Sequence, residues 1–257
     1  MSDLLKNKNI LIMGVANKWS IAWGIAKQAY QNGAQLLFSY YGDKSLRSLE
    51  KLTTEENIKN VKFVECDVTQ DENIEKTFDL IKEEFGVLHG VAHCIAHAKR
   101  EELEGEYVNT SRDGYAMAQD ISAYSLVAVS RYARPLMTEG GSIITLSYHG
   151  GVKAVKNYNV MGVAKAALEA SVRYLAVDLG KEDIRVNAIS AGPIKTASAR
   201  GVSDLNEMLS AFAERAPLKR PVDQEEIGKA AVFLLSSMSS AITGEILYVD
   251  CGYNILG

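Results

Sequence analysis

The sequence predicts an α/β fold, namely a doubly wound parallel sheet of about seven strands with helices on both faces. Short apolar runs alternate with longer amphipathic stretches along the whole chain, which is typical of successive βαβ units. Most of the short runs are continuously apolar, as expected for strands that are covered on both faces. No proline-, glycine- or serine-rich linker interrupts the series, so residues 1–257 are expected to form a single domain.

The expected strands are rich in Val, Ile, Leu and Phe and are bounded by Gly, Asn or Asp. They comprise residues 9–13, 35–40, 61–65, 88–93, 142–146, 185–189 and 246–249. The expected helices comprise residues 21–32, 44–54, 73–85, 122–137, 157–179 and 223–236. The weakly patterned stretch 194–215 is rich in small and polar residues and predicts a mobile substrate-binding flap or a short helical insert.

Composition narrows the functional classes. An apolar content of 47% is enough for a large core, and 28 basic against 32 acidic residues argue against nucleic acid or an anionic membrane as the main partner. The cysteines Cys66, Cys94 and Cys251 have neither metal nor redox spacing. The first residues show no signal-peptide pattern and no stretch is long enough to span a bilayer, so a cytoplasmic protein is expected.

The first β–α turn has the layout of a dinucleotide site. The first expected strand ends in Gly14, and the next helix begins at Ile21 after Ser20. Backbone N–H groups and the positive helix end at such a turn favour a diphosphate. The usual G-x-G-x-x-G pattern is absent, however, so this turn alone leaves an ordinary β–α connection open.

The ends of the next two strands bear on the choice of cofactor. An acidic residue after the second strand favours NADH and a basic cluster favours NADPH. Neither follows Tyr41 directly, since Lys44 and Arg47 come later, so NADH is expected and NADPH stays possible. After the third strand, Asp67 is suited to accept a hydrogen bond from adenine or, alternatively, to cap the next helix.

Three histidines recur at four-residue spacing, at His89, His93 and His97. On a helix this spacing would suit a metal site. The residues between them are typical of a strand and no acidic residue accompanies them, so no metal site is expected.

The strongest chemical signal comes from Tyr148, Tyr158 and Lys165. If Tyr158 opens a helix, Lys165 lies two turns later on the same face. A lysine ammonium near a phenol is expected to lower the pKa of the tyrosine and make its hydroxyl a proton donor or oxyanion partner. The spacing therefore predicts a catalytic pair.

Together these motifs resemble the short-chain dehydrogenases/reductases over essentially the whole chain. Two departures stand out: six residues separate Tyr158 from Lys165 instead of three, and Tyr148 lies where a catalytic serine is usual. These departures, and the fingerprint Gly14-x5-Ser20-x-Ala22-x-Gly24, are similar to the divergent enoyl-acyl-carrier-protein reductases of bacterial fatty-acid synthesis.

The resemblance implies a Rossmann-like fold, NADH as the cofactor, and reduction of the trans-2 double bond of enoyl thioesters on acyl carrier protein, in a homotetramer. It implies that Tyr148, Tyr158 and Lys165 are catalytic and that Ala98 touches the acyl substrate. The residues that it assigns to the cofactor are Gly14, Ser20, Ile21, Tyr41, Asp67, Val68, Ile95, Lys165, Ile194, Lys195, Thr196, Ala197 and Ser198.

Two other functions remain possible from the sequence. A ketoacyl- or alcohol-type short-chain reductase would need a serine beside the tyrosine, and Ser147 is one position away, on the opposite side of its strand. A sensor that binds NAD(H) without turnover belongs to another class. The intact pair of Tyr158 and Lys165 argues against a sensor, which needs no acid at the hydride site.

Overall fold

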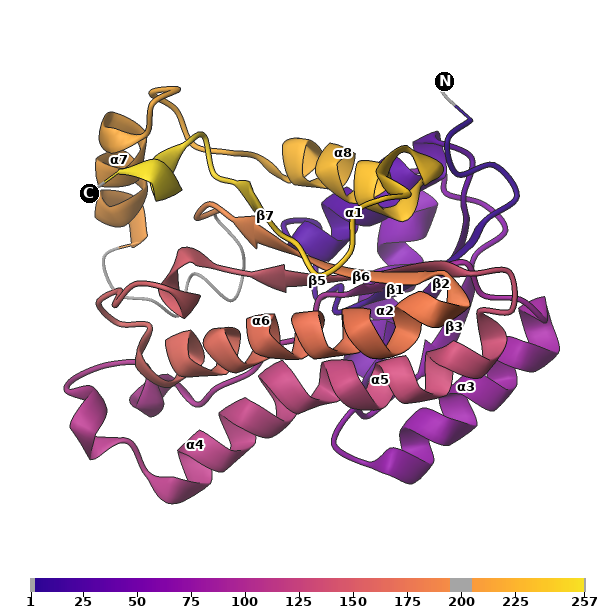
Figure 1. Cartoon of the computed structure of the whole chain (residues 1–257), viewed down its shortest axis with the longest axis horizontal. Coiled ribbons are helices and arrows are strands. Elements are labelled where there is room, and N and C mark those ends of the chain that lie inside the picture. Colours follow the sequence, from indigo (N-terminus) through magenta and orange to yellow (C-terminus); the bar gives the residue numbers. More distant parts are fainter. Residues whose placement is uncertain (1–2, 195–204, 257) are drawn as a thin grey trace.

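The computed structural model describes residues 3–194 and 205–256. All the strands of the described chain lie in one parallel sheet of seven strands with the order β3-β2-β1-β4-β5-β6-β7 (Figure 1). They are β1 (Asn9–Met13), β2 (Gln35–Tyr40), β3 (Lys62–Glu65), β4 (Gly90–His93), β5 (Gly141–Ser147), β6 (Ile184–Ala191) and β7 (Ile246–Val249). The predicted fold is confirmed. The strand order reverses between β1 and β4, which is where such sheets bind ligands.

Helices cover both faces of the sheet (Figure 1). The helices are α1 (Ile21–Gln31), α2 (Asp43–Glu55), α3 (Asp71–Phe85), α4 (Arg112–Gln119), α5 (Ser125–Ala133), α6 (Asn159–Leu179), α7 (Leu205–Arg215) and α8 (Gln224–Leu235). One buried cluster joins the sheet to α1, α2 and α8, with Trp23 and Phe38 among its largest side chains. A second joins the opposite face to α3, α5 and α6 through Phe78 and Leu168. The strands are thus buried on both sides, as their continuous apolar runs predict.

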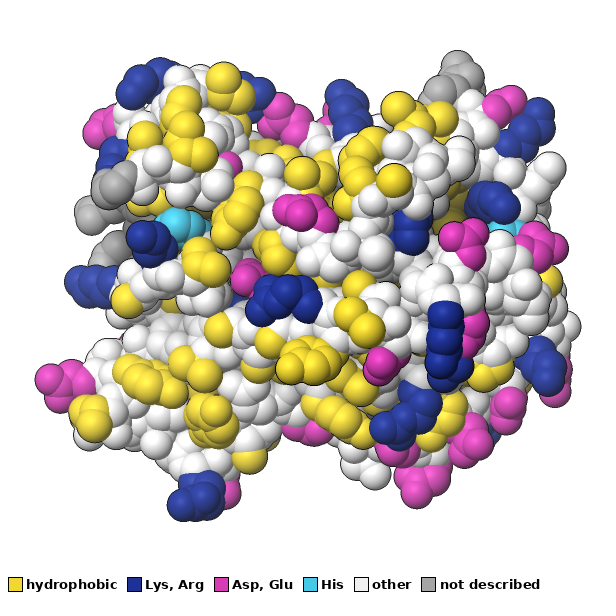
Figure 2. Space-filling view, viewed as in Figure 1, with side chains coloured by type: hydrophobic (Ala, Val, Ile, Leu, Met, Phe, Trp, Pro, Cys, Tyr) yellow, Lys and Arg dark blue, Asp and Glu magenta, His cyan; other side chains and the backbone are white. Residues whose placement is uncertain are grey.

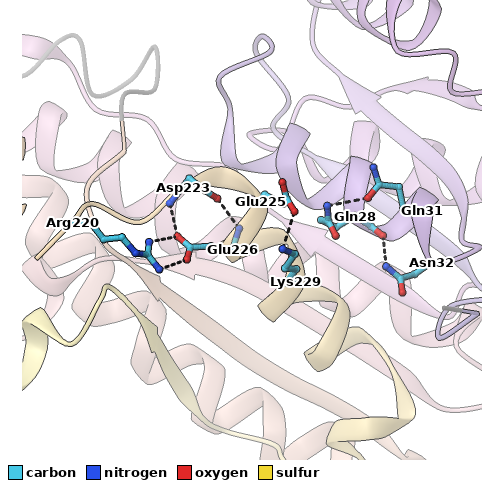
Figure 3. Close-up of polar contacts among 8 residues, drawn as sticks. All are labelled: Gln28, Gln31, Asn32, Arg220, Asp223, Glu225, Glu226 and Lys229. Atoms are coloured by element: carbon cyan, nitrogen blue, oxygen red, sulfur yellow. Dashed lines mark hydrogen bonds and ion pairs between the residues drawn. The ribbon is translucent and has the colours of Figure 1, made fainter. Parts of the chain in front are cut away.

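The start of α1 is fixed by α8. A Cβ on Gly24 would lie 2.5 Å from the carbonyl oxygen of Gln224, so only glycine permits this helix crossing. The Gln224 side-chain amide donates a hydrogen bond of 3.0 Å to the Ser20 carbonyl. Asp223 and Glu226 form a capping box that starts α8 at this point (Figure 3). This contact holds the first turn of α1 in place beneath the Gly14 turn.

The helix predicted at residues 122–137 is longer and more irregular than expected. It begins with α4, passes through a π-helical segment at Asp120–Tyr124, and continues as α5 to Ala133. The prediction missed α4 because the helix has only eight residues, contains Gly114 and buries only Gly114 and Ala118, so no stripe of large apolar side chains marks it. The helix nevertheless forms there because the Ser111 hydroxyl accepts the Gly114 N–H at 3.0 Å and caps the first turn.

The predicted flap at residues 194–215 is described only in part. Its second half forms α7, in agreement with a short helical insert, whereas residues 195–204 lie outside the described residues. Phe212 of α7 stacks on Tyr253 with ring centroids 4.4 Å apart, so α7 packs against the turn that follows β7. Among the helices of the described ranges, none is both long and apolar enough to cross a bilayer.

Candidate active site

A cavity of about 420 Å³ opens at the carboxyl ends of β1, β4, β5 and β6. The predicted site residues that line it are Gly14, Ser20, Ile21, Ile95, Ala98, Tyr148, Tyr158, Lys165 and Ile194. These residues come from four separate β–α connections along the chain. The parallel sheet brings them together because the carboxyl ends of its strands share one edge.

Gly14 permits the close approach of β1 and β4 at this edge. Its backbone has φ +87°, and a Cβ on it would lie 2.1 Å from the carbonyl oxygen of Cys94. The Cys94 N–H donates to the Met13 carbonyl at 3.2 Å, which extends the pairing of the two strands to this point. Burial raises the pKa of the Cys94 thiol to about 12, so this thiol is neutral and no nucleophile.

The turn between Gly14 and α1 is organised by Ser20. Its hydroxyl oxygen accepts the backbone N–H groups of Ala16 at 3.1 Å and of Asn17 at 3.0 Å. A hydroxyl that accepts two hydrogen bonds still has its own proton to donate. No acidic residue lies in the first turn of α1. The positive end of this helix and the Ser20 hydroxyl therefore fit the diphosphate of a dinucleotide.

The predicted catalytic residues meet at one side of the cavity. Tyr158 is the N-cap residue of α6, and Lys165 lies two turns later, 5% exposed, with its Nζ donating to the Leu146 carbonyl at 2.8 Å. The Tyr158 ring meets the Tyr148 ring edge to face, with centroids 4.8 Å apart. A Cβ on Gly150 would lie 2.5 Å from the Tyr158 ring, so this glycine makes room for the pair.

The electrostatics differ from the expectation for Tyr158. Burial, together with Tyr148, raises its pKa above that of a free phenol, and burial also raises the pKa of Tyr148 to about 12. Burial lowers the pKa of Lys165 to about 8. The expectation that Lys165 lowers the pKa of Tyr158 is wrong here, because burial and Tyr148 set that pKa and the Lys165 ammonium is bonded to the Leu146 carbonyl instead. Both phenols are protonated at neutral pH and are neutral hydrogen-bond donors.

Several residues assigned to the cofactor lie outside this cavity. Tyr41 directly follows β2 and is 69% exposed, and the Val68 side chain is buried in the core. One oxygen of Asp67 accepts hydrogen bonds from the N–H (3.0 Å) and the hydroxyl (2.7 Å) of Thr69, so it organises the turn after β3. All three lie where the sheet continues beyond β1. Lys195, Thr196, Ala197 and Ser198 lie outside the described residues.

The cavity also has an apolar wall that the sequence reasoning missed. Leu103, Val155 and Met161 line it beside the tyrosine pair. Met161 was detectable, since it lies three residues after Tyr158 on the same helix face. Leu103 and Val155 lie outside helices and strands, where no periodicity marks them.

The three histidines at four-residue spacing do not converge on the cavity as a group. His93 is fully buried, with its ring nitrogens 3.1 Å from the Thr145 hydroxyl and 2.9 Å from the Ser125 hydroxyl. Burial lowers the pKa of His93 to about 3, so its ring is neutral. Within residues 3–194 and 205–256, no three His, Cys, Asp or Glu side chains are grouped so that they could hold a metal ion.

Comparison with known proteins identifies the family. The model of the family "Enoyl-(Acyl carrier protein) reductase" matches residues 14–254. The chain is 56% identical over 255 residues to the Bacillus subtilis enoyl-acyl-carrier-protein reductase (NADH) FabI, covering 99% of each chain. It is 52% identical over 252 residues, 98% of each chain, to the Staphylococcus aureus protein of the same name marked NADPH.

Solved structures agree with this. The Bacillus cereus enoyl-acyl carrier protein reductase, crystallised with NADP⁺ and indole naphthyridinone, superposes with a TM-score of 0.98 at 56% identity and full coverage of both chains. The Anaplasma phagocytophilum enzyme in complex with NAD superposes with a TM-score of 0.94 at 44% identity, covering 100% of this chain and 95% of that one. The chain therefore belongs to the enoyl-acyl-carrier-protein reductases.

Proposed function

We propose that the chain reduces the trans-2 double bond of enoyl thioesters carried on acyl carrier protein, with NADH, in the last step of each fatty-acid elongation cycle. The observation that carries this proposal is the cavity in which Tyr148, Tyr158 and Lys165 meet at the switch point of the sheet. A protonated phenol beside an apolar wall suits an uncharged enoyl group whose oxygen gains negative charge during the reaction.

The cofactor would be held along the carboxyl edge of the sheet, within one nucleotide-binding domain formed by the whole chain. When bound, NADH supplies the hydride for the β-carbon of the enoyl group. Gly14, Ser20 and Ile21 would bind its diphosphate, and Lys165 its nicotinamide ribose. Tyr41, Asp67 and Val68 would border the adenosine. Ile95, Ile194 and residues 195–198 would flank the nicotinamide.

Each side chain of the site has its own role in the proposed reaction. Tyr158 donates a hydrogen bond to the thioester oxygen as negative charge develops there, and its raised pKa keeps the proton on the phenol. Tyr148 supports the Tyr158 ring and shapes the pocket. A proton from water then adds to the α-carbon, which balances the hydride at the β-carbon and completes the reduction, and Tyr148 would support this proton transfer. Ala98, Leu103 and Met161 would contact the acyl chain and exclude water.

The structure weighs against the ketoacyl or alcohol alternative. In those reductases a serine hydroxyl assists the tyrosine. Here the Ser147 hydroxyl donates to the buried Glu169 carboxylate, so its single proton is already engaged.

For its partners we propose the acyl carrier protein and three further copies of the chain, in the cytoplasm. Arg100 lines the cavity and Lys99 beside it is exposed, so both are placed to attract an acidic carrier protein. Lys195 and Arg200, outside the described residues, would add to this charge.

A hydrophobic surface on α6 supports the proposed homotetramer. Figure 2 shows hydrophobic side chains over α6, where Tyr174 and Val177 are 78% and 80% exposed. Such a face supports a homotetramer.

The choice between an enoyl and a ketoacyl substrate tests the proposed function. Purified protein is incubated with NADH or NADPH and either crotonyl- or acetoacetyl-acyl-carrier protein, and cofactor oxidation is followed by absorbance. The proposal expects oxidation with the crotonyl thioester and none above background with the acetoacetyl thioester. Oxidation with acetoacetyl alone would support the ketoreductase, and oxidation with neither would support a sensor.

A further inference from the structure

Glu169 is a buried acid beside the proposed active site. It lies one turn after Lys165 on α6, is 5% exposed, and accepts a hydrogen bond of 2.5 Å from the Ser147 hydroxyl at the end of β5. A Cβ on Gly151 would lie 2.9 Å from its Oε1, so the loop after β5 closes directly over it. Burying a carboxylate is costly unless it is hydrogen-bonded or paired with a charge. Its burial here calls for a reason.

Helix α6 holds the end of β5 at two successive residues. Lys165 donates to the Leu146 carbonyl at 2.8 Å, and Glu169 accepts from the next residue, Ser147. Tyr148 comes directly after and packs on Tyr158. The backbone that carries Tyr148 is therefore fixed by the same helix turn that carries the lysine.

Glu169 also balances the charge of Lys165. Burial lowers the pKa of Lys165 to about 8, while Cys94 and Glu169 oppose that lowering. His93 at the end of β4 and Cys94 directly after it face the lysine, and both are neutral at pH 7 because their pKa values are about 3 and about 12. From β7, Tyr248 faces Glu169, and its raised pKa keeps that phenol neutral. Of these four neighbouring groups, Glu169 is the acid suited to carry the opposite charge.

We propose that Glu169 is a positioning residue of this site: its carboxylate anchors Ser147 and supplies the counter-charge that keeps Lys165 protonated for the cofactor ribose. The role of Lys165 in this statement rests on the proposed function. Glu169 does not itself line the cavity and acts through Ser147 and Lys165, which do. Residues i and i+4 of a helix are neighbours on one face. The Lys165 ammonium is bonded to Leu146 and the Glu169 carboxylate to Ser147, so the counter-charge acts across this short distance without a direct ion pair.

The first measurement follows the titration of Lys165 in the full-length protein without cofactor. Lysine labelled with ¹³C at Cε is observed by NMR, and the Lys165 signal is assigned from its loss in Lys165→Met. In Glu169→Gln the pKa of Lys165 should fall by about one unit or more, because an opposite charge at this range favours the ammonium by that much. Glu182→Gln, which removes an exposed carboxylate paired with Arg134, is the matched control and should leave the titration unchanged.

The second measurement is the dissociation constant of NADH at pH 6 and pH 8, by fluorescence. At pH 6 Lys165 is protonated with or without Glu169, and Glu169→Gln should bind almost as tightly as the wild type. At pH 8 the same variant should bind about fivefold more weakly, since a shift of one unit leaves about a tenth of the lysine charged. Ser147→Ala keeps the carboxylate and should weaken binding by the same factor at both pH values, with the Lys165 titration close to that of the wild type.

A Lys165 titration that is identical in the wild type and Glu169→Gln would overturn the proposal, as would an equal loss of NADH affinity at pH 6 and pH 8. If Glu169→Gln does not fold, Glu169→Asp replaces it and should shift the Lys165 pKa in the same direction by less, and no shift again overturns the proposal. The NMR titration needs no substrate. A wild type that fails to reduce crotonyl thioester would therefore defeat the proposed function and leave the Glu169 result standing.

Discussion

The rings of Tyr148 and Tyr158 meet edge to face, with centroids 4.8 Å apart and planes inclined at 70°. This contact couples the end of β5 to the start of α6. Because both rings are withdrawn from water, the pKa of each phenol is raised. Tyr158 thus keeps its proton near neutral pH, as a donor to a developing oxyanion requires.

Tyr148→Phe should be the mildest change among the three proposed catalytic residues. The ring contact with Tyr158 survives and only the hydroxyl is lost, so kcat should fall by less than about tenfold. Tyr148→Ala removes the ring as well and should cost more in both stability and kcat. Steady-state kinetics and thermal unfolding of the two variants check this. A Phe variant as impaired as Tyr158→Phe would mean that the roles of the two tyrosines are reversed.

Lys165→Ala should weaken NADH binding by about tenfold or more, because a charged hydrogen bond to the ribose is lost. In the wild type, the pKa of Lys165 is lowered to about 8, so the ammonium is present below this pH and is lost as the pH rises through it. NADH affinity should therefore decline above pH 8. Fluorescence titrations from pH 6 to 10 measure this, with the exposed Lys181→Ala as control. Constant affinity over that range would contradict the assignment.

NADH should be the preferred cofactor. Lys44 and Arg47 are exposed on α2 and neither directly follows β2, so no basic cluster is in place for the 2′-phosphate of NADPH. Values of kcat/KM with the two cofactors test this. A kcat/KM about tenfold higher with NADPH, abolished in Arg47→Glu, would show that Arg47 binds the phosphate.

The docking of the carrier protein should depend on the basic residues near the cavity. Arg100 lines the cavity. Its Nε donates a hydrogen bond of 3.2 Å to Oε1 of Glu104. Arg100→Glu and Arg200→Glu should raise KM for crotonyl-acyl-carrier protein by about three- to tenfold and spare crotonyl-coenzyme A. Lys76→Glu, on the exposed face of α3, is the control. Equal losses with both substrates would show that these residues do not bind the carrier.

Much of the fold was predictable because the strands are short and apolar on both faces. Three of the seven predicted strands, residues 9–13, 35–40 and 246–249, have the observed bounds. The helix α4 was not predictable, since its eight residues show no apolar stripe and its start depends on a cap at Ser111. The capping residue Ser111 donates its N–H to the buried Glu102 at 3.1 Å. Glu102 lies nine residues before Ser111, and no local sequence pattern links these two residues.

The positions of the site residues were predictable where helical spacing sets them. The properties that depend on burial were not predictable. Tyr158 and Lys165 follow from two turns of α6, and the cavity contains both. The raised pKa of Tyr158 depends on how deeply packing buries it, which spacing cannot give. The role of Glu169 could not be predicted either, because it also depends on burial. An acid four residues after a lysine is usually a surface pair, and only the contact of α6 with the end of β5 withdraws it from water.

The central claim, that Tyr158 donates to the thioester oxygen, is tested most directly by Tyr158→Phe. The loss of one such donor costs about 2.7–4 kcal/mol in the transition state, so kcat with NADH and crotonyl thioester should fall by about 10²–10³-fold. The dissociation constant of NADH, measured by fluorescence, should stay within about twofold of the wild type, because the ring remains. Wild-type turnover in Tyr158→Phe would contradict the account.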